Sequence, residues 1–234
     1  MRLALYSLIL LGAVLLVLDL AKLIKGIAPP EKPVPVKADP TDQPASVTGN
    51  TDGHPDVAQS LALYTRAIEK SPNEAQPYVD RANAHTANND YAKAIADYDQ
   101  AIKLDPENTD YILQRGTLYL GSNNPDQAIA NFTKALEINP ELIKALAYRA
   151  ITNFRHKKHQ AALDDCLLML QKDPAFTDLH TTIAQCYKAL GQNDKAISHL
   201  KTYLESTQDP QGKQEAEALI KEWSGQPAQP SAQP

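Results

Sequence analysis

The feature that most constrains this chain is a sequence repeat with a period of 34 residues. Residues of one kind return at this spacing in several registers, so a single supersecondary unit is copied along the chain. Each unit of such an array buries its apolar face only against its neighbours, which predicts a stack of similar units. The two clearest registers are Pro72, Pro106, Pro140 and Pro174, and Ala94, Ala128, Ala162 and Ala196.

Each repeated position has a physical role in a pair of antiparallel helices. Small residues let two helices cross closely, aromatic residues fill the space between pairs, and a buried ring contributes roughly 1.5–3 kcal/mol. The residue before a proline is pushed out of the helical region, so the repeated prolines end each second helix. Asparagine or glycine tolerates the left-handed turn within a pair. These residues are Ala82, Gly116, Ala150 and Ala184 (small), Tyr98 and Phe132 (aromatic), and Asn89, Asn123 and Gly191 (turn).

A polar column repeats with the same period. Arg81, Arg115 and Arg149 recur at the seventh position, facing Asp97, Asn131 and Asp165 at the twenty-third, whereas the last repeat has Ile183 and His199. Because both positions change together, we interpret them as a polar pair within each hairpin rather than as a ligand site.

Two stretches resemble the helices of a tetratricopeptide repeat (TPR): Gln-Arg-Gly-Thr-Leu-Tyr at 114–119 and Tyr-Ala-Lys-Ala-Ile-Ala-Asp-Tyr at 91–98. The resemblance covers about residues 56–223 and implies an all-α TPR superhelix of stacked antiparallel helix hairpins. We expect a TPR domain at 55–224, with a half repeat at 56–71, repeats at 75–108, 109–142, 143–176 and 177–210, and a capping helix at 213–223. In the frame 41–74 only the second helix survives, because Pro44, Gly49, Gly53 and Pro55 disfavour the first.

The N-terminus is apolar and uncharged from Leu3 to Leu18, and a helix extended through Ile24 is long enough to cross a bilayer. We therefore expect one transmembrane signal-anchor helix at 1–25 ahead of the repeats, a Pro-rich linker at 26–54 and a disordered tail at 225–234. A cleaved signal peptide is the main alternative.

The side of the membrane on which the repeats lie is less constrained by the sequence. Lysines after the apolar run favour a cytoplasmic repeat domain by the positive-inside rule. The two-residue segment before the run and the spacer-like linker favour the periplasmic or outer side, which is our expectation.

The TPR resemblance implies that the first helices line a concave groove for a peptide or protein ligand. The middle of this groove is apolar and its flanks are basic, so we expect a ligand with apolar anchors and at least one acidic group. The alternative is that some of the apolar residues pack within the stack. A clamp for chaperone tails is not expected, because Val79, Gln114 and Tyr148 replace three of its five residues. The groove residues implied are Asn83, Leu113, Thr117, Leu120, Lys144, Ala147, Ile151, Phe154, Arg155 and Lys188.

Other chemistries fit the sequence poorly. A net charge of −5 argues against nucleic acid as the partner. The sequence also contains no nucleophile–base pair and no phosphate-binding loop of the kind that enzymes use, so we do not expect an enzyme. We expect no cofactor and no metal, since His156 and His159 lack a third ligand nearby. We expect Cys166 and Cys186 to be small core residues. The alternative is that they form a disulfide, which requires that the domain lies outside the cytoplasm. We therefore expect a membrane-anchored interaction scaffold or assembly factor; the alternative is a homo-oligomer that self-assembles through the half repeat.

Overall fold

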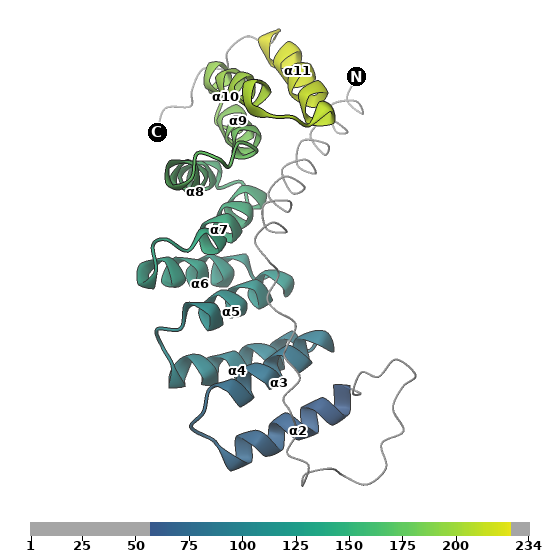
Figure 1. The fold of residues 1–234 in the computed structure, drawn as a ribbon, viewed down its shortest axis with the longest axis vertical. Helices are drawn as coiled ribbons and strands as arrows, with labels where there is room; N and C mark the ends of the chain where they lie inside the picture. The colour runs from purple at the N-terminus through teal and green to yellow at the C-terminus, as the bar shows by residue number, and fades with distance from the viewer. Residues whose placement is uncertain (1–56, 226–234) are drawn as a thin grey trace. The chain divides into compact units, whose positions relative to one another are not determined.

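The computed structural model describes residues 57–225, and every regular element within them is an α-helix (Figure 1). The expected anchor, the linker and residues 226–234 of the expected tail lie outside the described residues. In the described part no helix combines the length and the apolar character needed to cross a bilayer. The helices are α2 (Val57–Lys70), α3 (Gln76–Ala87), α4 (Tyr91–Leu104), α5 (Thr109–Gly121), α6 (Pro125–Ile138), α7 (Ile143–Arg155), α8 (His159–Lys172), α9 (Leu179–Ala189), α10 (Asn193–Ser206) and α11 (Pro210–Ser224).

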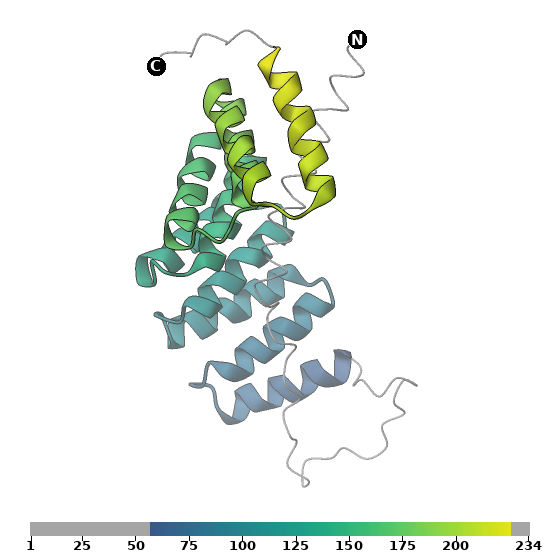
Figure 2. The same ribbon diagram turned by 45° about the horizontal axis from the view of Figure 1, so that its top comes forward.

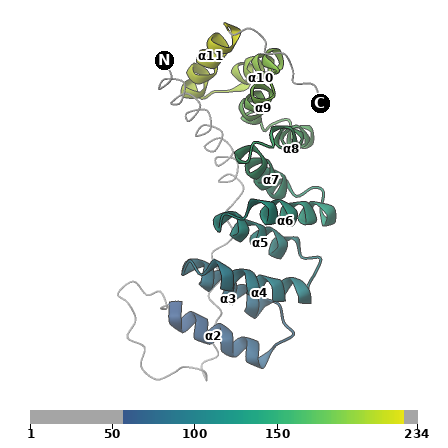
Figure 3. The same ribbon diagram turned by 180° about the vertical axis from the view of Figure 1, so that it is seen from behind.

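The described residues form two compact units, each a run of consecutively packed helices. The N-terminal unit, residues 57–140, holds α2 to α6, and the C-terminal unit, residues 141–225, holds α7 to α11. In each unit every helix packs against the next one in sequence, as Figures 1 and 3 both show. The expected antiparallel hairpins are therefore present as α3–α4, α5–α6, α7–α8 and α9–α10.

The repeated small and aromatic positions form the core of these hairpins. The alanine column is buried in all four, with Ala94, Ala128 and Ala196 fully enclosed, and Phe132 is also completely buried. A Cβ placed on Gly116 would lie 2.6 Å from Phe132 Cε1, so glycine permits the close approach of α5 to α6. The small residues therefore lie where the two helices of a hairpin cross, as the sequence predicts.

Each hairpin turns through one residue with a positive φ. Asn89, Asn123 and Gly191 have φ values of 61°, 59° and 76°, as the turn pattern predicts. In the α7–α8 hairpin the same place is taken by Lys157, with φ 60°. Glycine has no Cβ to crowd the backbone here, and the short polar side chain of asparagine can hydrogen-bond locally, whereas lysine has neither advantage. The turn at Lys157 is therefore strained relative to the other three.

The last helix covers the end of the C-terminal unit. It begins at Pro210 rather than at residue 213, because the side chain of Asp209 accepts a hydrogen bond from the Gln211 backbone nitrogen (3.1 Å) and caps it. It lies along α10 (Figure 2) and buries Ala216 and Trp223. Residues 213–223, expected to form a capping helix, fall within α11.

Candidate peptide-binding surfaces

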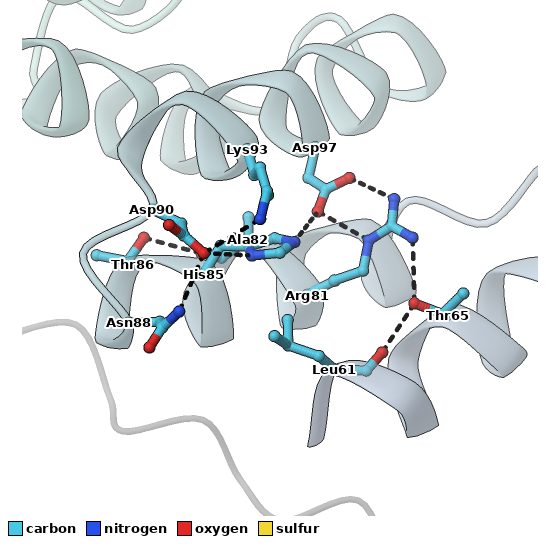
Figure 4. Close-up of polar contacts among 10 residues, drawn as sticks. All are labelled: Leu61, Thr65, Arg81, Ala82, His85, Thr86, Asn88, Asp90, Lys93 and Asp97. Carbon is cyan, nitrogen blue, oxygen red and sulfur yellow. Dashed lines mark hydrogen bonds and ion pairs between the residues drawn. The ribbon is translucent and has the colours of Figure 1, made fainter. Parts of the chain in front are cut away.

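The recurring arginine column forms ion pairs and hydrogen bonds inside the hairpins. Arg81 Nε and Nη2 donate to the two carboxylate oxygens of Asp97 at 2.9 and 2.7 Å (Figure 4). Arg149 makes the same two-pronged contact with Asp165 at 3.0 and 2.6 Å. In α5–α6, Arg115 Nε donates to the Asn131 side-chain oxygen at 2.8 Å. The acceptors are buried, so the interpretation of this column as a pair within each hairpin is confirmed.

The same arginines also reach back to the preceding helix. Arg81 Nη1 donates to Thr65 Oγ1 on α2 at 3.3 Å (Figure 4), and Arg115 Nη1 lies 2.6 Å from an Asp99 oxygen on α4. The sequence reasoning missed these partners, although Thr65 and Asp99 are themselves 34 residues apart. Arg81 and Arg115 thus tie their own hairpins to the helix that precedes each of them.

Around Asp97 the N-terminal unit carries further charge. The His85 ring is half-buried, with Nε2 3.9 Å from Asp97 and Nδ1 3.8 Å from Asp90 (Figure 4). These distances exceed hydrogen-bond length. Hydrogen bonds from Asn88 and then Lys93 lower the pKa of the Asp90 carboxyl. The cluster joins α3 to α4 and their turn.

Burial dominates the electrostatics of the Arg149–Asp165 pair. It raises the pKa of the Asp165 carboxyl, and the hydrogen bond from Arg149 offsets this only in part. In buried ion pairs the free-energy cost of removing both charges from water is often larger than the gain from their attraction. Such pairs therefore fix the geometry of the helices more than they add net stability. This pair therefore orients α7 on α8.

The last hairpin replaces the arginine–carboxylate pair with two histidines. His180 Nδ1 and His199 Nδ1 lie 2.9 Å apart, and the Tyr187 ring centroid is 5.4 Å from that of His199. Burial lowers the pKa of both imidazoles, and His180 lowers that of His199 further. At this distance one ring must donate and the other accept, so the contact requires at least one neutral imidazole.

In the N-terminal unit the expected groove residues lie along α3 and α5. Asn83 is half-buried, and its side-chain oxygen accepts a hydrogen bond from the Tyr98 hydroxyl at 2.9 Å. Leu113 is buried, Leu120 is half-buried, and the Thr117 hydroxyl donates to the Gln114 carbonyl oxygen at 2.7 Å. In this unit Leu120 and Thr117 therefore present more surface to a ligand than Leu113 does.

In the C-terminal unit the expected residues lie along α7 and on α9. Ala147 and Ile151 are buried, as the packing alternative for the apolar residues requires. Lys144 and Phe154 are half-buried, and the Phe154 ring meets the His159 ring edge-on with centroids 5.0 Å apart. Arg155 is exposed at the end of α7.

On α9, Lys188 faces the capping helix. Its Nζ lies 5.3 Å from the Trp223 ring centroid, a cation–π contact. Burial lowers the pKa of this ammonium group, and the Glu222 carboxylate opposes the shift. Trp223 and Glu222 were assigned only to the cap from the sequence, because their approach to Lys188 depends on how α11 crosses α9.

Gln185, three residues before Lys188 on the same helix, supplies a hydrogen-bond acceptor. Its side-chain oxygen is buried and has no hydrogen-bond partner among the described residues. Thr181, Gln185 and Lys188 follow at i, i+4 and i+7, so they lie on one face of α9. A buried carbonyl oxygen without a donor costs roughly 1–3 kcal/mol. The rest of Gln185 is half-buried, so a rotation of its side-chain amide would bring the oxygen to the surface, where a ligand N–H group would relieve that cost.

The two cysteines are buried free thiols on α8 and α9. Burial raises the pKa of the Cys186 thiol to about 12 and that of Cys166 well above its ordinary value. Thiols in this state are poor nucleophiles. Among residues 57–225 no three His, Cys, Asp or Glu side chains come together as metal ligands would.

Consecutive antiparallel hairpins repeated every 34 residues define an α-helical repeat protein. Profiles of the tetratricopeptide repeat family match residues 75–108, 113–175 and 153–220. The chain therefore contains tetratricopeptide repeats and belongs to that family.

Solved structures show the same fold. YrrB, described as a TPR protein with an unusual peptide-binding site, is 20% identical with a TM-score of 0.59, over 69% of this chain and 84% of its own. MamA is 22% identical with a TM-score of 0.55, over 64% and 86% of the two chains. MamA from Desulfovibrio magneticus RS-1 is 15% identical with a TM-score of 0.55, over 64% and 84%. No curated protein sequence matches the chain.

Proposed function

We propose that this chain is a protein–protein interaction scaffold or assembly factor that binds a peptide or protein segment on the first helices of its repeats. The observation that carries the proposal is the buried, unpartnered side-chain oxygen of Gln185 on α9. A backbone N–H group of a bound segment is a suitable donor for it, because every residue of a peptide except proline carries one. The peptide-binding site named for YrrB supports this kind of function for the fold.

The charges on the same helices indicate the chemistry of the ligand. Lys144 begins the α7 stripe and Arg155 ends it, and Lys188 lies one turn after Gln185 on α9. The half-buried Phe154 offers an apolar contact between the basic ends. We therefore propose a ligand with an apolar anchor and at least one acidic group.

Capture by the full chain tests this proposal. The chain is solubilised in detergent and used as bait in a lysate of its source cells, beside the variants Gln185→Leu and Lys144→Glu. Gln185→Leu removes the unpartnered oxygen while keeping the volume, so we expect lost capture together with unchanged or slightly higher thermal stability. Lys144→Glu reverses a charge and should release a ligand that has an acidic group.

Matched substitutions on second helices serve as controls. Gln171→Leu on α8 and Lys201→Glu on α10 make the same chemical changes at exposed positions. Capture that persists in these controls and disappears in the two first-helix variants supports the proposal. Capture that survives both first-helix variants places binding on another surface.

Membrane attachment is a separate part of the proposal and rests on the apolar run Leu3–Leu18. We propose that residues 1–25 hold the repeat domain at the membrane, on the periplasmic or outer side. Protease added to intact cells, or to spheroplasts if the cell has an outer membrane, would then digest the repeats, whereas a cytoplasmic domain would be protected.

A further inference from the structure

Helix α2 is the second helix of a hairpin whose first helix is missing from the described residues. Its face formed by Ser60, Leu63, Tyr64 and Ala67, here called the open face, occupies the positions that form the core of the complete hairpins. Ser60, Tyr64 and Ala67 are only half-buried, and α2 contains no buried residue. The residues equivalent to these three are all buried: Ala94, Ala128, Ala162 and Ala196; Tyr98, Phe132, Cys166 and Leu200; Ala101, Ala135, Met169 and Tyr203.

The fourth residue of the open face indicates what kind of group covers it. Leu63 is 41% exposed, the highest value among the large hydrophobic residues of the described part that are exposed. It stands at the position where Asp97 and Asp165 receive an arginine from the first helix of their own hairpins. Leucine cannot accept such a bond, so the open face is suited to an apolar neighbour rather than to a first helix of the repeated type.

Two other parts of the chain are poor candidates for this neighbour. Residues 41–56 directly precede α2, but Pro44, Gly49, Gly53 and Pro55 disfavour a helix there. The outward side of α11 carries exposed Gln214, Glu217 and Lys221, which do not match an apolar surface. The sequence and the polarity of α11 therefore argue against both self-coverage and head-to-tail stacking of copies.

We infer that the open face of α2 binds the same face of a second copy of this chain in an antiparallel, two-fold symmetric pair. In that arrangement Leu63 faces Tyr64 of the partner copy, and Ser60 faces Ala67, so large residues meet at the centre and small ones at both ends. Arg66 then lies opposite an uncharged residue of the partner copy and not opposite the partner's Arg66. A symmetric interface requires this self-complementarity.

The size of the interface sets its strength. A helix of 14 residues is about 21 Å long. One helix face per partner falls below the roughly 1,200 Å² typical of stable complexes. The dimer is therefore weak and reversible, and attachment of both copies to one membrane would favour it.

Cysteine cross-linking of the full chain tests the register. Cys166 and Cys186 are buried, so an introduced cysteine is the reactive one. Leu63 lies beside the two-fold axis, and we expect Leu63→Cys to form a disulfide-linked dimer under mild oxidation. Ser60→Cys alone should not, because the two copies of residue 60 are roughly 10 Å apart along the helices.

A mixture of Ser60→Cys and Ala67→Cys chains should cross-link. Leu168→Cys, on α8 and 38% exposed, is the matched control and should stay monomeric.

Sedimentation of the full chain in detergent micelles tests the association itself. We expect a concentration-dependent dimer for the natural chain, loss of that dimer in Leu63→Glu, and its retention in Leu168→Glu. A natural chain that shows no dimer at about 200 µM, where a dimer with a Kd of about 100 µM would be more than half formed, overturns the inference. A dimer that persists in Leu63→Glu, or cross-links equally through Leu168→Cys, also overturns it by locating the contact elsewhere.

Discussion

The close approach of α5 to α6 predicts that Gly116→Ala destabilises the protein, although alanine is the better helix former. Replacing glycine with alanine inside a helix normally gains about 1 kcal/mol. Here the new Cβ would lie 2.6 Å from Phe132 Cε1, 2.9 Å from Phe132 Cδ1 and 3.1 Å from Asn131 Cβ. Phe132 is fully buried and cannot swing away, so overpacking costs roughly 1–3 kcal/mol. The expected net loss is about 0–2 kcal/mol.

Gly121 provides a matched control at the end of the same helix. A Cβ there would meet Tyr91 Cε1 at 3.6 Å, an ordinary contact, so Gly121→Ala should be neutral or gain up to about 1 kcal/mol. Urea denaturation of the full chain, followed by circular dichroism, compares the two variants. Phe132→Leu should recover part of the loss in a Gly116→Ala background, since the two sites are coupled. A Gly116→Ala chain as stable as Gly121→Ala would refute the steric reasoning.

Three further predictions concern the polar contacts and the strained turn. Asp165→Asn keeps an acceptor for Arg149 and should cost less than about 1 kcal/mol in urea denaturation, whereas Asp165→Ala should cost about 1–3 kcal/mol. Lys157→Asn should raise the melting temperature by roughly 2–4 °C, because asparagine adopts φ 60° more readily. Because burial lowers the pKa of His180 and His199 below 6.5, the folded state binds fewer protons than the unfolded one. Stability should therefore be full above pH 6.5 and fall as the pH drops through the lowered values; a His199→Gln chain that shows an unchanged slope would contradict this.

Much of the local structure could be predicted from the sequence. The 34-residue spacing identified four hairpins, and the Asn89, Asn123 and Gly191 turns have the positive φ expected of them. The Arg81–Asp97 pair was also predicted. The seventh and twenty-third positions of the repeat change together from one repeat to another, which indicates that their side chains are in contact. These features depend on neighbouring residues in one hairpin, where sequence spacing sets the geometry.

The candidate surface could be predicted only in part. The stripes on the first helices follow from helical periodicity, but the sequence does not say how far each residue is covered. Ala147 and Ile151 are buried, whereas Leu120 and Phe154 are half-buried on equivalent faces. The unpartnered oxygen of Gln185 was not foreseen, since its isolation depends on every neighbour that could have donated to it.

The sequence by itself therefore determined the repeat, the class of fold and the pairing inside each hairpin, because these follow from local spacing and backbone preference. Only the tertiary structure decided which helix faces are covered. Leu63 remains exposed because no helix of the described residues covers that face of α2. Arg81 reaches Thr65 and Lys188 meets Trp223 because of how each hairpin is rotated against the helix beside it. That rotation depends on side-chain volumes drawn from different repeats at once, so no single period in the sequence specifies it.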